Sequence, residues 1–148
     1  MIKTLVSIEN KLKWIPLMKQ LKVLVLDDRA ERHIKINSEL IGSCILFNCY
    51  TLEAAKKVYE KEKPDFLLLD RDLDSKEYTG EDFVEYMINN SHKPGFIFIH
   101  SINSPAAKRM YDSLKEHNFN PILMPFISIN YKQIKKALKY YEGRKKDS

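Results

Sequence analysis

The chain has 148 residues, which is enough for one domain with a complete hydrophobic core. Hydrophobic residues make up 44% and charged residues 30%, as in an ordinary soluble globular protein. No apolar run approaches the roughly 20 residues of a membrane-spanning helix, and the N-terminus lacks the compact apolar block and small-residue cleavage site of a signal peptide. We therefore expect neither a membrane segment nor a secretory signal.

The net charge of +5 is concentrated near the C-terminus. The basic residues of that segment are Lys132, Lys135, Lys136, Lys139, Arg144, Lys145 and Lys146. They are typical of a solvated helix face that ends in a basic tail, and the alternative is a surface that makes weak contact with nucleic acid.

The two cysteines, Cys44 and Cys49, are five positions apart in one predicted strand. An odd spacing directs them to opposite faces, so they are not expected to pair. Without a disulfide, a reduced, cytoplasmic location is favoured.

Five short apolar runs predict strands covered on both faces, because their apolar character is continuous rather than alternating. These runs are Lys22–Leu26, Cys44–Asn48, Phe66–Leu69, Gly95–Ile99 and Pro121–Met124.

Five segments of helical period separate or follow these runs. Their predicted apolar stripes are Ile34, Asn37 and Ile41; Ala54, Ala55, Val58 and Tyr59; Phe83, Val84, Met87 and Ile88; Ala107, Met110 and Leu114; and Ile134, Leu138 and Tyr141. Thr79-Gly80 followed by two acids predicts the start of the third helix, and Ser104-Pro105 the start of the fourth.

Strict alternation of strands and helices predicts an α/β fold with a doubly wound, five-stranded parallel sheet. We assign residues 21–142 to this domain and residues 143–148 to a basic tail. Residues 1–20 form an N-terminal extension, which adds either a helix or an edge strand.

Ligands of such sheets bind at the carboxyl ends of the strands, so the residues after each apolar run are the candidates for a site. Asp27 and Asp28 follow the first run, and Asp70 and Asp72 follow the third. Clustered carboxylates repel one another unless a cation lies among them, and hard oxygen ligands suit Mg²⁺ or Mn²⁺. We predict these four aspartates as metal ligands.

The fourth run ends in His100, Ser101 and Asn103, just before a predicted helix start that attracts anions. His100 fits a general acid or base, although a packed core histidine would also fit this position. Arg32 and His33 follow Asp28 and fit a position over the same rim, where Arg32 would clamp a phosphate. A surface charge on a helix would fit Arg32 equally well.

The strings LDDRAERH, LLLDRDL, TGEDFVEYM and IHSINSPAAKRM resemble the cyclic-phosphate-processing receiver domains, over roughly Lys22 to Phe126. The resemblance implies a flavodoxin-like, receiver-type three-layer sandwich. It also implies metal-dependent processing of cyclic phosphates, either 2′,3′-cyclic phosphate RNA ends or cyclic nucleotides, in RNA repair or host–virus conflict.

Carried over by motif position, the resemblance assigns catalytic roles to His100, Asp70 and His33. It assigns substrate binding to Arg32, Ser101, Asn103 and Arg109, and metal binding to Asp27, Asp28, Asp70 and Asp72. The sequence departs from the family pattern at Ala107, where a glycine is common.

Three functions follow from these residues: a metal-dependent cyclic phosphodiesterase, a non-catalytic cyclic-nucleotide binder, or a signalling receiver with Asp70 as phosphoacceptor. Signalling receivers resemble the chain at its aspartates but carry a lysine at the end of the fifth strand, where Met124 stands here. They also carry Ser or Thr in place of His100. Both departures count against the signalling receiver, and they leave the phosphodiesterase and the non-catalytic binder.

Overall fold

The structure, a computed structural model, describes residues 20–73, 79–101, 104–125 and 129–146. The predicted N-terminal extension therefore lies almost wholly outside the described residues. In chain order the elements are β1 (Lys22–Leu26), α2 (Ala30–Leu40), β2 (Ile45–Cys49), α3 (Leu52–Glu62), β3 (Phe66–Asp70), α4 (Gly80–Ile88), β4 (Phe96–Ser101), α5 (Ser104–Glu116), β5 (Pro121–Pro125) and α6 (Tyr131–Lys146).

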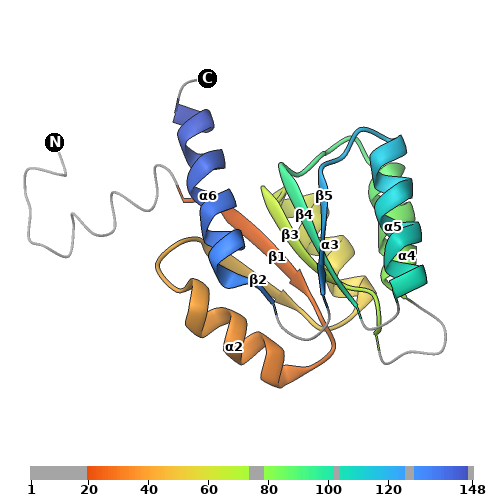
Figure 1. The fold of residues 1–148 in the computed structure, drawn as a ribbon, viewed down its shortest axis with the longest axis horizontal. Helices are drawn as coiled ribbons and strands as arrows, with labels where there is room; N and C mark the ends of the chain where they lie inside the picture. The colour runs from red at the N-terminus through yellow and green to blue at the C-terminus, as the bar shows by residue number, and fades with distance from the viewer. Residues whose placement is uncertain (1–19, 74–78, 102–103, 126–128, 147–148) are drawn as a thin grey trace, which may run out of the picture.

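The five strands form one parallel sheet in the order β2-β1-β3-β4-β5. Helices cover both faces, α2 and α6 on one and α3, α4 and α5 on the other (Figure 1). The predicted three-layer sandwich with a doubly wound parallel sheet is confirmed.

Each face of the sheet carries its own hydrophobic core, because successive side chains of a strand point to opposite faces. In β1, Val23 and Val25 belong to the core under α2 and α6, whereas Leu24 and Leu26 belong to the core under the other three helices. The strands read as continuous apolar runs for this reason.

The predicted start of the third helix is confirmed at α4. Thr79 is its N-cap and forms a capping box with Asp82, and the Thr79 amide donates to Asp82 Oδ2 over 2.6 Å. This box fixes the chain where it returns from the end of β3, since the Gly80 amide donates to the Arg71 carbonyl over 3.1 Å.

The predicted stripe of α2 is wrong. Ile34 and Ile41 are 70% and 80% exposed, and the residues that α2 buries are His33, Ile36 and Leu40. The inward face is rotated by one position because a histidine, which the apolar pattern does not count, occupies one of its places. The stripes predicted for the other four helices lie in or against the two cores.

The C-terminal boundary also differs from the prediction, because α6 continues to Lys146. Residues 143–146, which we expected in a tail, are the last turn of that helix. Cys44 and Cys49 are both buried and form no disulfide with each other. They lie in the cores on opposite faces of the sheet, as predicted. Among the described residues, no helix has the length and apolar character needed to cross a membrane.

Candidate functional site

The register of the sheet brings the ends of three strands together. Leu26 of β1 is level with Leu69 of β3, and Asp70 of β3 is level with His100 of β4. Asp27, Asp70 and His100 therefore share one level and, by the two-residue alternation, one face, on the side of α2 and α6. Parallel strands ending at one edge place two carboxylates and an imidazole side by side.

Three of the predicted metal ligands form a compact group. Asp27, Asp28 and Asp70 each offer a carboxylate oxygen, and these oxygens lie within 4.8 Å of one another. Asp27 and Asp70 are each 3% exposed, and Asp28 is half-buried. The group is reached from the rim of the sheet through Asp28.

Asp72 lies outside this group of three. The chain turns after β3, and the Asp72 amide donates to Asp70 Oδ1 over 3.1 Å. Its side chain lies instead beside the Arg71 guanidinium, with 3.4 Å between Oδ1 and Nη1. We predicted Asp72 as a metal ligand together with Asp70, but β3 ends at Asp70 and the chain does not continue as a strand to Asp72.

Burial and, second to it, the neighbouring charge of Asp27 together raise the pKa of Asp70 to about 7. The Asp72 amide and the Arg32 guanidinium act in the opposite direction and lower this pKa. A nearby cation therefore stabilises the charged form of this buried carboxylate.

Arg32 supplies such a cation from the first turns of α2. Its Nη1 donates to Asp27 Oδ2 over 3.1 Å and to Asp70 Oδ2 over 3.2 Å. Burial lowers the pKa of Arg32, but the carboxylates of Asp27, Asp70 and Asp28 outweigh that effect and raise it. The guanidinium thus lies among the acids rather than stretched over the rim.

His33 does not lie over the rim as we expected. It is 2% exposed, with Nε2 2.7 Å from the Asp27 carbonyl oxygen and Nδ1 2.7 Å from Asn48 Oδ1. Its ring stacks on Tyr50 with 4.1 Å between the ring centroids. Both nitrogens are engaged within the protein, so the position is that of a residue that supports the loop carrying Asp27.

His100 lies at the end of β4, 8% exposed, and lines a small cavity together with Asp27, Asp70 and Met124. The free volume of this cavity is about 10 Å³, close to the space that one water molecule needs. The Arg71 amide donates to the His100 carbonyl over 3.2 Å, which ties the ends of β3 and β4 together. His100 is thus beside the acids, with its ring largely covered.

Two of the predicted substrate-binding groups lie outside the part of the chain that the structure describes. Asn103 lies outside the described residues, and so does the side chain of Ser101. Ala107, the departure from the family pattern, lies on α5 in the core shared with α3 and α4.

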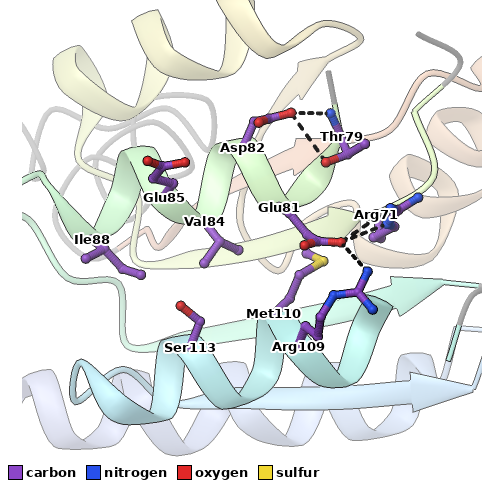
Figure 2. Close-up of a pocket in the computed structure, with 10 residues that line it drawn as sticks. All are labelled: Arg71, Thr79, Glu81, Asp82, Val84, Glu85, Ile88, Arg109, Met110 and Ser113. Atoms are coloured by element: carbon purple, nitrogen blue, oxygen red, sulfur yellow. Dashed lines mark hydrogen bonds and ion pairs between the residues drawn. The ribbon is translucent and has the colours of Figure 1, made fainter. Parts of the chain in front are cut away.

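Arg109 does not reach the acid group and lines a separate groove between α4 and α5. Figure 2 shows Glu81 between two arginines, with Oε1 3.0 Å from Arg109 Nη2 and 3.3 Å from Arg71 Nη2. This groove has a volume of about 560 Å³. Arg71 also lines a second depression of about 530 Å³ at the rim, with Asp28 and Asp72, so it stands between the two.

Sequence reasoning missed Arg71 and Glu81. Arg71 is the residue between two predicted ligands, and Glu81 was interpreted only as an acid that suits a helix start. No sequence pattern joins them, because their contact depends on how the chain returns from β3 to α4.

The chemistry of the acid group fits a divalent metal ion. Its donors are all carboxylate oxygens, and one of its members is partly open to solvent. The raised pKa of Asp70 reflects burial and, second, the charge of Asp27, and a bound cation opposes both effects. Mg²⁺ and Mn²⁺ suit an incomplete set of hard ligands of this kind, because they keep water molecules in the remaining positions.

Solved structures of low sequence identity share the fold. A signal receiver domain from Vibrio parahaemolyticus superposes with a TM-score of 0.67 at 20% identity, covering 86% of this chain and 93% of its own. A response regulator receiver domain from Clostridium thermocellum superposes with a TM-score of 0.66 at 15% identity, covering 85% of this chain and 97% of its own. A CheY-like receiver domain from Methanospirillum hungatei superposes with a TM-score of 0.64 at 11% identity, covering 86% of this chain and 98% of its own.

Comparison with curated proteins gives no match. The family comparison does: residues 22–116 match the family described as cyclic-phosphate processing receiver domain. This segment runs from the first residue of β1 to the last of α5 and contains every residue of the acid group, together with Arg32 and His100. With the receiver fold and the acid group at the carboxyl ends of β1 and β3, the chain belongs to the family of cyclic-phosphate processing receiver domains.

Proposed function

We propose that this protein is a metal-dependent phosphoesterase that opens cyclic phosphates. The observation that carries the proposal is the convergence of Asp27, Asp28 and Asp70 with His100 at one edge of the sheet. Three carboxylates with an adjacent imidazole provide ligands for a cation and a group that transfers protons.

In this proposal Asp27, Asp28 and Asp70 hold Mg²⁺ or Mn²⁺. When bound, the ion would supply Lewis-acid chemistry for the phosphoryl group and for the attacking water. His100 takes the proton of the attacking water or gives one to the departing sugar oxygen. Because His100 is buried beside Asp70, the substrate has to enter from the rim, along the depression lined by Asp28, Arg71 and Asp72.

A signalling receiver, phosphorylated on Asp70, is the alternative function. Against it stands Met124, which is 4% exposed and level with His100 in the neighbouring strand. A thioether there offers no positive charge to an acyl phosphate. A non-catalytic cyclic-nucleotide binder would use the same rim without turnover.

The test is incubation of the purified protein with a panel of 2′,3′-cyclic phosphate RNA ends and cyclic nucleotides, with and without Mg²⁺ or Mn²⁺. Products are separated by chromatography. We expect metal-dependent ring opening that His100→Ala abolishes. His117→Ala is the matched control, because His117 is an exposed histidine in the turn that follows the last residue of α5.

Each alternative has its own outcome in this test. Binding without product in the wild type would favour the binder, and labelling of Asp70 by acetyl phosphate would favour the signalling receiver. Absence of both metal-dependent binding and hydrolysis across the panel would overturn the phosphoesterase.

We further propose that the substrate is met in the cytoplasm, in RNA repair or in conflict with viruses. The exposed lysines of α6, Lys132, Lys136 and Lys139 among them, would then add a weak, salt-dependent attraction to an RNA end. If they do, ring opening of RNA ends falls with added salt more steeply than that of cyclic mononucleotides. Equal salt dependence would exclude this role for α6.

A further inference from the structure

We propose that Arg32 is an internal counter-ion that a divalent metal displaces from the acid group, and that the released guanidinium then binds the phosphoryl group of the substrate. This inference rests on the proposed function and adds an order of events to it. Metal binding comes first, and it prepares the phosphate site.

The contacts of Arg32 show why it competes with a metal. A single nitrogen, Nη1, lies 3.1 Å from Asp27 Oδ2 and 3.2 Å from Asp70 Oδ2. Mg²⁺ binds carboxylate oxygens at about 2.1 Å, so an ion shared by these two oxygens would lie within a few ångströms of Nη1. Two positive charges so close repel strongly, most of all between two carboxylates that are 3% exposed.

Arg32 can leave this position without unfolding the site. Its side chain is 24% exposed, which means that part of it already faces solvent. It lies on the first turns of α2, next to Arg29, Ala30 and Glu31, which line the rim depression together with Asp28. In this proposal, a change of side-chain rotamer carries the guanidinium toward that depression.

Once released, the guanidinium is suited to a phosphoryl group. It keeps its charge at any working pH and presents five donors in a planar fork that fits phosphate oxygens. In the metal-free protein the same fork is held by Asp27 and Asp70, so it is withheld from a phosphate.

Displacement makes metal and phosphate binding cooperative. The metal frees Arg32 for phosphate, and by linkage phosphate must strengthen metal binding by the same factor. Removing the charge of Arg32 has opposite effects on the two ligands: the metal loses a competitor, and the phosphate loses a donor.

The experiment measures both affinities in the full-length chain. Mn²⁺ binding is followed by the loss of its electron paramagnetic resonance signal, and binding of inorganic phosphate by calorimetry with and without saturating Mg²⁺. The variants are Arg32→Gln, which removes the charge, Arg32→Lys, which keeps the charge but loses the fork, and Arg29→Gln as the control. Arg29 is 59% exposed at the same rim, and only its backbone amide contacts Asp27.

We expect Arg32→Gln to bind Mn²⁺ about tenfold more tightly than the wild type, which is an ordinary size for coupling between sites. With Mg²⁺ present, the same variant should bind phosphate about tenfold more weakly, whereas without Mg²⁺ the two proteins should bind it equally weakly. Arg32→Lys should bind Mn²⁺ like the wild type and lose phosphate affinity only with Mg²⁺. In Arg29→Gln, any change in phosphate affinity should be the same with and without Mg²⁺.

Two results separate this inference from the proposed function. If the wild type binds Mn²⁺ and Arg32→Gln binds it no more tightly, the displacement is overturned and the metal site stands. If the wild type does not bind Mn²⁺, the metal-dependent function fails, and the inference fails with it. Should Arg32→Gln not fold, Arg32→Lys still decides, because an unchanged phosphate affinity in the presence of Mg²⁺ would overturn the role of the fork.

Discussion

At the residue scale, the acid group is a source of instability that the protein retains. Asp70 is buried beside Asp27, and its pKa is raised to about 7 from an ordinary 3.8. The folded protein therefore holds a proton on Asp70 across a range of pH in which the unfolded chain has already released it. Groups that are unfavourable for folding and gathered at the end of a sheet are typical of binding sites.

The sign of this effect predicts a pH dependence. The contribution of Asp70 to stability is complete below about pH 4 and is lost as the pH rises to about 7, with a slope of at most about 1.4 kcal/mol per pH unit. We expect the metal-free wild type to lose stability relative to Asp70→Asn over this interval. The measurement is urea unfolding of both proteins at several pH values.

At pH 8 without metal, Asp70→Asn should be the more stable protein, by about 1 to 2 kcal/mol. Saturating Mg²⁺ should reverse that order, because only the wild type gains from a bound ion. Asp112→Asn, at an exposed aspartate paired with Lys108, is the control and should follow the wild type. An Asp70→Asn variant that is stabilised by Mg²⁺ as much as the wild type would contradict the assignment.

At the element scale, α2 places Arg32 and His33 and packs its inward face on the sheet. Ile36 is 1% exposed in the core under this helix, whereas Ile34, two positions earlier, is 70% exposed. The same substitution at these two positions therefore separates the observed face from the one predicted by sequence.

Ile36→Ala should cost about 2 to 4 kcal/mol of unfolding free energy, because it leaves a cavity in a closely packed core. Ile34→Ala should change stability by less than about 0.5 kcal/mol. Chemical denaturation of the two variants measures both values. Equal losses would mean that α2 is rotated from the orientation described.

The start of α4 is a second place where an element controls the site. A Cβ at Gly80 would lie 2.7 Å from the Asp70 carbonyl oxygen and 2.8 Å from the Arg71 Cα. Both contacts are with backbone, so they cannot be relieved by rotating a side chain. Gly80 is needed because α4 passes directly against the end of β3.

Gly80→Ala should therefore destabilise the protein by about 1 to 3 kcal/mol, the range for overpacking, and weaken Mn²⁺ binding by displacing Asp70. Gly143→Ala is the matched control, since a Cβ there has nothing within 4 Å. In the helix α6 that substitution should be neutral or slightly stabilising. The measurement is the Mn²⁺ affinity of Gly80→Ala compared with that of Gly143→Ala. Equal affinities would show that the position of the end of β3 does not depend on the contact with Gly80.

At the scale of the whole molecule, the two cores separated by the sheet unfold as one unit in a domain of this size. Cys44 lies in one core and Cys49 in the other, and burial raises the pKa of both thiols to about 11. A buried, protonated thiol reacts slowly with alkylating reagents.

We expect iodoacetamide at pH 8 to modify the native protein far more slowly than the urea-unfolded chain. Mass spectrometry should find the two cysteines modified together rather than in sequence. Rapid modification of Cys49 alone would show that the face carrying α3 opens independently, which the single-unit description does not allow.

Much of the fold could be predicted because its signals are local. The five apolar runs became the five strands within one or two residues, and the acids after β1 and β3 met at one edge, since parallel strands leave no other arrangement. The inward face of α2 could not be predicted in this way. Its buried His33 looks polar, and its exposed Ile34 and Ile41 look apolar.

The details of the site were the least predictable part. The contact of Arg32 with Asp70 joins residues 38 positions apart, and that of Arg109 with Glu81 joins residues 28 apart. Such contacts depend on side-chain rotamers and on how helices return to the sheet, which no periodicity encodes. The same holds for the turn that separates Asp72 from Asp70.

The shared face of Asp27, Asp70 and His100 also limits how the length of this chain can change. Deleting or inserting one residue inside β1, β3 or β4 would turn the site residue at the end of that strand to the opposite face of the sheet. The core side chains beyond the change would likewise move from one hydrophobic core to the other. Within these strands, an insertion or deletion therefore keeps the site together only if it adds or removes an even number of residues before the site residue.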